Sequence, residues 1–223
     1  MATRTSSTLV GRDTELKDLE SWLRGAAGEG RPVSGVLLGG DAGVGKTRLL
    51  NEVRDRLAAD GWRVVVGHCL DLGDTALPYL PFSEILGHMA TELPDVVSGV
   101  ASRHPALARL QPGRRMLGAE ATESASVDRS DLFEAVRALL EEAASTAPLL
   151  LVVEDTHWAD RSTRDLLSFL LTRGFAAPVV VVASYRADDL HRRHPLRRQV
   201  AEWTRLTGVR RMTLGPLDEA AVR

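Results

Sequence analysis

Residues 39–47 read GGDAGVGKT and fit the pattern G-x-x-x-x-G-K-[ST], which is typical of a loop that cradles nucleotide phosphates. Such a loop must bring several backbone N–H groups close to the phosphate oxygens without side chains in the way. Glycine allows that approach, and Gly40, Gly43 and Gly45 provide it here. The pattern therefore predicts that this chain binds a nucleoside triphosphate.

The side chains that close the loop have separate predicted roles. The ammonium group of Lys46 is placed to reach the β- and γ-phosphates, and the hydroxyl group of Thr47 is placed to bind Mg²⁺. The loop residues that we expect at the nucleotide are Gly40, Asp41, Ala42, Gly43, Val44, Gly45, Lys46, Thr47 and Arg48.

The motif requires a strand before the loop and a helix after it, and the sequence offers both. Residues 33–38 form a short, mostly apolar run. After the loop, apolar residues recur at helical spacing until Gly61, and these are Leu49, Leu50, Val53, Leu57 and Ala58.

Further apolar runs alternate with helical patterns along the chain. The runs are residues 62–67, 149–153, 179–183 and 210–214. Residues 149–153 lack polar alternation, which suits a strand covered on both faces in a parallel sheet. Residues 161–173 have helical spacing, with Ser162-x-x-Asp165 as a variant capping box. The alternation predicts a three-layer α/β fold with a mostly parallel five-stranded sheet and helices on both faces.

Residues 71–127 are less regular, because prolines at 78, 81, 94, 105 and 112 interrupt them. We expect an irregular helical insert there, between the second and third strands. We expect residues 1–215 to form one domain, and residues 216–223 to be the truncated start of a helical lid.

Composition excludes several kinds of partner. The net charge of −2, from 28 basic and 30 acidic residues, gives no overall attraction to nucleic acid or membrane. No apolar stretch approaches the length that crosses a bilayer, and the single cysteine, Cys69, cannot form an intramolecular disulfide. We expect a cytosolic location and a buried, unreactive thiol at Cys69.

Glu154 and Asp155 come directly after the most apolar run. Carboxylates at the end of a buried strand are costly unless they meet a cation, a donor or water. We assign Glu154 to the Mg²⁺ shell and Asp155 to the attacking water, with the reverse assignment left open. Another alternative is that one of the two caps the following loop.

Arg186 follows the fourth strand, at the edge where open α/β sheets bind ligands, and it is a candidate sensor of the γ-phosphate. An ordinary surface arginine is the alternative. His157 follows the acidic pair, and we expect it to pack or to anchor a loop.

Together these motifs resemble the AAA-type ATPase module of the STAND class. More narrowly, they are similar to the N-terminal module of the large LuxR-type bacterial transcription regulators. The resemblance rests on residues 9–16 (LVGRDTEL), 40–50 (GDAGVGKTRLL), 78–82 (PYLPF), 150–160 (LLVVEDTHWAD) and 184–186 (SYR).

The resemblance implies ATP or ADP with Mg²⁺ as cofactors, and ATP used as a switch. It places Val10, Gly11 and Arg12 near the adenine, gives Arg186 the sensor role, and makes Pro216 the start of the lid. It also implies self-association through this module, and DNA binding only through regions outside these residues.

Two other functions remain open at this point. A P-loop kinase would pass the phosphoryl group to a small molecule, with Arg103, Arg109, Arg114 and Arg115 of the insert available for a lid. A scaffold would bind nucleotide without turnover.

Overall fold

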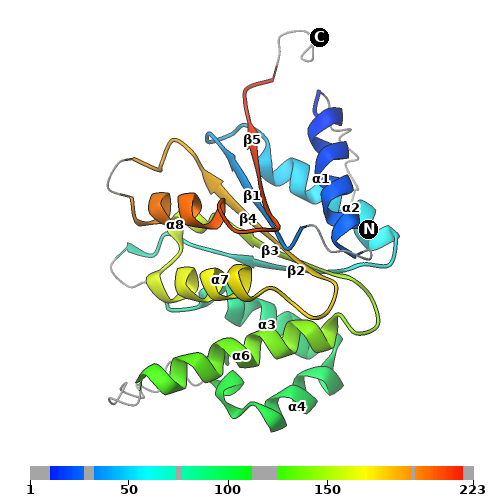
Figure 1. Ribbon diagram of the computed structural model, residues 1–223, viewed down its shortest axis with the longest axis vertical. Helices are drawn as coiled ribbons and strands as arrows, with labels where there is room; N and C mark the ends of the chain where they lie inside the picture. Colours follow the sequence, from blue (N-terminus) through cyan, green and yellow to red (C-terminus); the bar gives the residue numbers. More distant parts are fainter. Residues whose placement is uncertain (1–10, 28–32, 74–76, 112–124, 192–193, 218–223) are drawn as a thin grey trace, which may run out of the picture.

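A computed structural model describes residues 11–27, 33–73, 77–111, 125–191 and 194–217. Its centre is a five-stranded sheet in which all the paired strands are parallel (Figure 1). The strands are β1 (Gly35–Gly40), β2 (Arg63–His68), β3 (Leu149–Glu154), β4 (Val179–Arg186) and β5 (Val209–Leu214), and their spatial order is β2-β3-β4-β1-β5. The expected α/β class and sheet are confirmed, and the sheet is parallel throughout.

Helices cover both faces of the sheet, as predicted. On one face lie α1 (Asp13–Ala27) and α2 (Lys46–Ala59), whose leucines pack on Val36 and Leu38 of β1. The helices of the other face pack on Leu37 and its equivalents in the neighbouring strands. They are α3 (Leu80–Glu92), α6 (Ala125–Ala143), α7 (Arg161–Arg173) and α8 (Pro195–Trp203). Since successive side chains of a strand point to opposite faces of the sheet, the apolar strands contribute side chains to two separate hydrophobic cores.

The expected insert between β2 and β3 is helical. It contains α3, α4 (Pro94–Arg103) and the 3₁₀ helix η2 (Pro105–Leu110), and it leads into α6. Proline stands in the first turn of α3, α4 and η2, where its missing N–H costs no hydrogen bond. In Figure 1, α4 and α6 lie at the bottom, away from α1.

One detail of the predicted α7 is wrong. The helix begins at Arg161 and ends before Gly174, but its N-cap is Asp160, not Ser162. The Asp160 carboxylate accepts hydrogen bonds from the backbone N–H groups of Ser162 and Thr163. Both residue types cap helices well, and the cap lies two residues earlier than the capping-box pattern suggested.

None of the described helices is long and apolar enough to cross a membrane.

The start of α3 is packed closely against β2 at Gly67. A Cβ atom there would lie 2.8 Å from the carbonyl carbon of Pro81 and closer still to its oxygen. We expect Gly67→Ala to lower the free energy of unfolding by about 1–3 kcal/mol, since backbone must shift to make room. Gly87→Ala is the control, because Gly87 is exposed within α3 and its added Cβ would meet no atom within 4 Å. Denaturant unfolding should show a lower free energy of unfolding for Gly67→Ala and a higher one for Gly87→Ala, because alanine favours a helix more than glycine does.

Candidate nucleotide-binding site

The loop between β1 and α2 has the backbone of an anion-binding nest. Gly43 and Gly45 have φ angles of 74° and 100°, which L side chains rarely adopt. A Cβ atom at either position would meet nothing within 4 Å, so the backbone conformation, not crowding, requires glycine. Helix α2 starts directly after Gly45, and its free N–H groups are available to phosphate oxygens.

Lys46 lies inside this loop and is buried. Its Nζ atom donates to the carbonyl oxygens of Gly40 and Asp41, each at 2.8 Å. Burial lowers the pKa of the Lys46 ammonium, and the carboxylates of Asp155, Asp188 and Asp41 act in the opposite direction. The chain therefore places the buried Lys46 ammonium and several carboxylates together at the mouth of the loop.

The loop and the end of β3 meet through Thr47 and Glu154. The Thr47 hydroxyl donates to Oε2 of Glu154 at 3.2 Å, across 107 positions of sequence. Glu154 is only 4% exposed, and Arg54 on α2 lies 3.7 Å from its other oxygen. The structure thus brings the two predicted Mg²⁺ ligands side by side.

Those two side chains fit a bound Mg²⁺. Hydroxyl and carboxylate oxygens are its preferred protein ligands, and it takes its remaining ligands from phosphates and water. No group of three or more His, Cys, Asp or Glu residues that could hold a metal ion occurs in the described part of the chain.

Asp155 lies in a different environment from Glu154. Its backbone is left-handed, with φ 56°, and its side chain is 41% exposed. Ser184 on β4 fixes this turn, because its hydroxyl accepts from the Asp155 N–H at 3.1 Å and its carbonyl accepts from the Thr156 hydroxyl at 2.8 Å. Non-glycine residues in this conformation often mark functional positions, where the surroundings hold the strain.

Arg186 ends β4 beside the loop. It pairs in register with Gly40, and the next residue, Ala187, donates its N–H to the Gly40 carbonyl at 3.1 Å. Its charge is close enough to contribute to the lowered pKa of Lys46. One edge of the sheet therefore holds five of the predicted phosphate, metal and sensor residues, which are Lys46, Thr47, Glu154, Asp155 and Arg186.

Arg12 connects this loop to the end of β5. Its buried guanidinium donates to the carbonyls of Val44, at 3.2 Å, and of Gly215, and it pairs with Glu15 at 2.6 Å. Gly215 directly precedes Pro216, which is exposed.

The remaining residues predicted at the nucleotide are Val10, Gly11 and Arg48. Gly11 and Arg48 are exposed. Val10 and residues 218–223 of the expected lid lie outside the described residues.

His157 links the loops that follow β3 and β4. Its side chain is fully buried, with Nε2 3.4 Å from Oδ2 of Asp189 and Nδ1 3.9 Å from Oδ1 of Asp155. Burial lowers the pKa of the imidazole, against the attraction of both carboxylates. This position suits a loop anchor more than a general base.

Sequence reasoning missed Ser184, Asp188 and Asp189 as parts of this site. Asp188 reaches the loop directly, since its Oδ2 atom accepts from the Ala42 N–H at 3.3 Å. All three residues lie at the carboxyl end of β4. The topological rule that singled out Arg186 would also have found Asp188 and Asp189.

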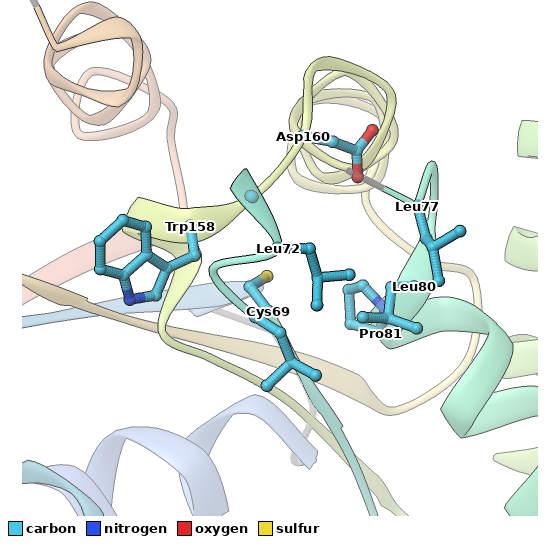
Figure 2. A pocket seen from close by; sticks show the side chains of 9 residues that line it. Cys69, Leu72, Leu77, Leu80, Pro81, Trp158 and Asp160 are labelled. Carbon is cyan, nitrogen blue, oxygen red and sulfur yellow. The ribbon is translucent and has the colours of Figure 1, made fainter. Parts of the chain in front are cut away.

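Cys69 lies close to the acidic end of β3 but is not a nucleophile. Figure 2 shows its sulfur among Leu72, Pro81 and Trp158, beside a hollow of about 10 Å³. That volume is roughly the space of one water molecule. Burial, with Asp160, Asp155 and Glu84 nearby, raises the pKa of the thiol to about 12.

Native Cys69 should therefore react slowly with thiol reagents. At pH 8 we expect labelling of the folded chain to be at least about a hundredfold slower than that of the chain in denaturant, because the thiolate is the reactive form. The chain has one cysteine, so the absorbance released by a disulfide reagent reports this site alone. Equal rates in both conditions would show that the thiol is accessible and ionised.

Comparison with known proteins places the chain in a family. Residues 8–182 match the AAA ATPase domain family, a range that includes the loop and the acidic pair. An uncharacterized protein of Rhizobium meliloti is 30% identical over 242 residues, covering 99% of this chain and 22% of the relative. The chain thus spans about a fifth of the length of that relative.

One solved structure with little sequence identity shares the fold. The Walker-type ATPase of Pyrococcus abyssi superposes with a TM-score of 0.51 at 14% identity, over 96% of this chain and 55% of that chain. A signal transduction ATPase with numerous domains (STAND) and a tetratricopeptide repeat sensor, from Pyrococcus horikoshii, gives a TM-score of 0.46 at 16% identity, over 92% and 23% of the two chains. The family match spans most of the chain, which therefore belongs to the AAA ATPase domain family.

Proposed function

We propose that this chain is a Mg²⁺-dependent ATP-binding module that hydrolyses ATP slowly and acts as a regulatory switch in a larger protein. The observation that carries the proposal is the contact of Thr47 with Glu154 at 3.2 Å, which joins the phosphate-binding loop to the acidic end of β3. Membership of the AAA ATPase domain family supports nucleotide binding.

Each group at this edge has a task in the proposed reaction. The N–H groups of the loop and the start of α2 hold the phosphates, and Lys46 and Arg186 neutralise their charge. Asp155, half-exposed at the edge, orients the attacking water and accepts its proton. Mg²⁺, held by Thr47 and Glu154, would supply further stabilisation of charge on the phosphate oxygens.

Two residues would transmit the presence or absence of the γ-phosphate to other parts of the protein. Arg186 lies on β4, and Arg12 joins the loop to Gly215, directly before the expected lid. A ligand shifts a conformational equilibrium by its differential contacts with the two states, and the γ-phosphate would make such contacts here.

The larger protein would be a transcription regulator of the LuxR type with a STAND module. The resemblance of residues 9–16 and 150–160 supports this assignment. The relative, of which this chain covers 22%, supports only the view that the module belongs to a longer protein. Self-association would then involve this module, and DNA would bind through other parts of the protein.

The arginines considered for a kinase lid do not support the kinase alternative. Of the arginines considered for a kinase lid, Arg103 pairs with Glu142 of α6 at 3.2 Å, within the insert itself. Arg114 and Arg115 lie outside the described residues.

Release of inorganic phosphate distinguishes hydrolysis from transfer. We expect slow phosphate release from ATP with Mg²⁺ in buffer alone, reduced to background by a chelator. A preparation that binds ATP but releases its phosphoryl group only after a hydroxyl or amine acceptor is added would support the kinase alternative. Binding without any turnover would support the scaffold.

A further inference from the structure

Asp188 places a carboxylate on the phosphate-binding loop itself. Its Oδ2 atom accepts the N–H of Ala42 at 3.3 Å, and this hydrogen bond is the main cause of its lowered pKa. The carboxylate is therefore ionised at neutral pH. It competes for an amide group in a loop whose other amides would face phosphate oxygens.

The backbone on both sides of Asp188 is fixed. Before it, Ala187 donates its N–H to the Gly40 carbonyl at 3.1 Å, and Leu190 donates back to the Ala187 carbonyl at 3.2 Å. After it, the Asp189 carboxylate faces Nε2 of the buried His157 at 3.4 Å. Asp188 is thus held at the mouth of the loop although its side chain is exposed.

The same carboxylate is among those that act on Lys46, the residue assigned to the β- and γ-phosphates. A terminal phosphate beside Lys46 would bring further negative charge toward Asp188, and like charges at short range repel. A diphosphate lacks that group and leaves the contact between Asp188 and Ala42 undisturbed. The cost therefore falls on the triphosphate.

We propose that Asp188 is a specificity-determining residue that lowers the affinity of this site for nucleoside triphosphate relative to diphosphate. The inference rests on the proposed nucleotide site and adds its preference between the two nucleotide states. Such a bias would keep the switch in its diphosphate form until another event favours exchange.

Asp188→Asn is the direct test, because it removes the charge and keeps an oxygen that accepts the Ala42 N–H. The dissociation constants of ADP and of a non-hydrolysable ATP analogue, both with Mg²⁺, are measured by calorimetry. We expect the ratio Kd(ATP analogue)/Kd(ADP) to fall about tenfold in the variant, and to fall less at high salt, which screens exposed charges. Asp55→Asn, the same change at an exposed position of α2, should leave the ratio within about twofold of the original.

Three results would overturn this assignment. A ratio unchanged in Asp188→Asn would show that the charge does not discriminate, and a raised ratio would show that it assists the triphosphate. An equal loss for both nucleotides would make Asp188 a support of the loop only. If the unaltered protein binds neither nucleotide, the proposed site fails as well, and this outcome is distinct from the other three.

Discussion

Lys46→Ala is expected to weaken binding of MgATP by at least about a hundredfold. The Lys46 ammonium is buried within the loop, and it lies 2.8 Å from the carbonyl oxygens of Gly40 and Asp41. Hydrogen bonds between charged groups in such a site contribute about 1.5–3 kcal/mol each, and a triphosphate would accept more than one. Fluorescence titration with a labelled ATP measures the loss directly.

The other lysine of the chain provides a matched control. Lys17 is exposed on α1, so Lys17→Ala should leave the affinity within about twofold of the original value. Thermal unfolding without nucleotide shows whether Lys46→Ala is still folded, since this lysine also bonds the loop backbone. A folded Lys46→Ala protein with unchanged affinity would mean that phosphate binds elsewhere.

Amide substitutions of the acidic pair should have different effects. Glu154→Gln is expected to remove most of the gain in ATP affinity that Mg²⁺ provides, because Glu154 is buried against Thr47. Asp155→Asn is expected to keep binding within about threefold and to lower turnover by about a hundredfold or more, as loss of a general base does. Binding with and without Mg²⁺, and phosphate release, are measured on each variant.

The outcome decides which role each carboxylate has. If Asp155→Asn removes the Mg²⁺ effect and Glu154→Gln removes turnover alone, the two assignments exchange. Normal binding and turnover in both variants would contradict a catalytic role for the end of β3. Glu92→Gln, an exposed change on α3, controls for the loss of one negative charge.

Much of the fold follows from local sequence. The predicted runs at 149–153 and 179–183 lie within β3 and β4, because uninterrupted β-branched and leucine residues suit a doubly covered strand. The strand order could not be obtained this way, since it depends on which strands pair over long separations. In particular, β4 lies between β1 and β3, which places Arg186 between the loop and the acidic pair.

The site was predictable where a motif fixes it and obscure where it depends on pairing between loops. The motif at residues 39–47 predicts phosphate binding by itself, and the position of Glu154 at the end of an apolar strand predicts a Mg²⁺ ligand. Ser184 carries no local signal, and the position of Asp188 after a strand does not identify its partner, because their contacts with Asp155 and Ala42 exist only once β4 is in place. Similarly, Asp160 and Ser162 are both good caps, and only the course of the turn after β3 decides between them.

A crystal structure with Mg²⁺ and a non-hydrolysable ATP analogue would test the central claim most directly. We expect the phosphates on the backbone N–H groups between Gly43 and Thr47, with the metal bound to the Thr47 hydroxyl and supported by Glu154. Nucleotide bound away from this loop, or a metal with no link to Thr47 or the acidic end of β3, would contradict the account.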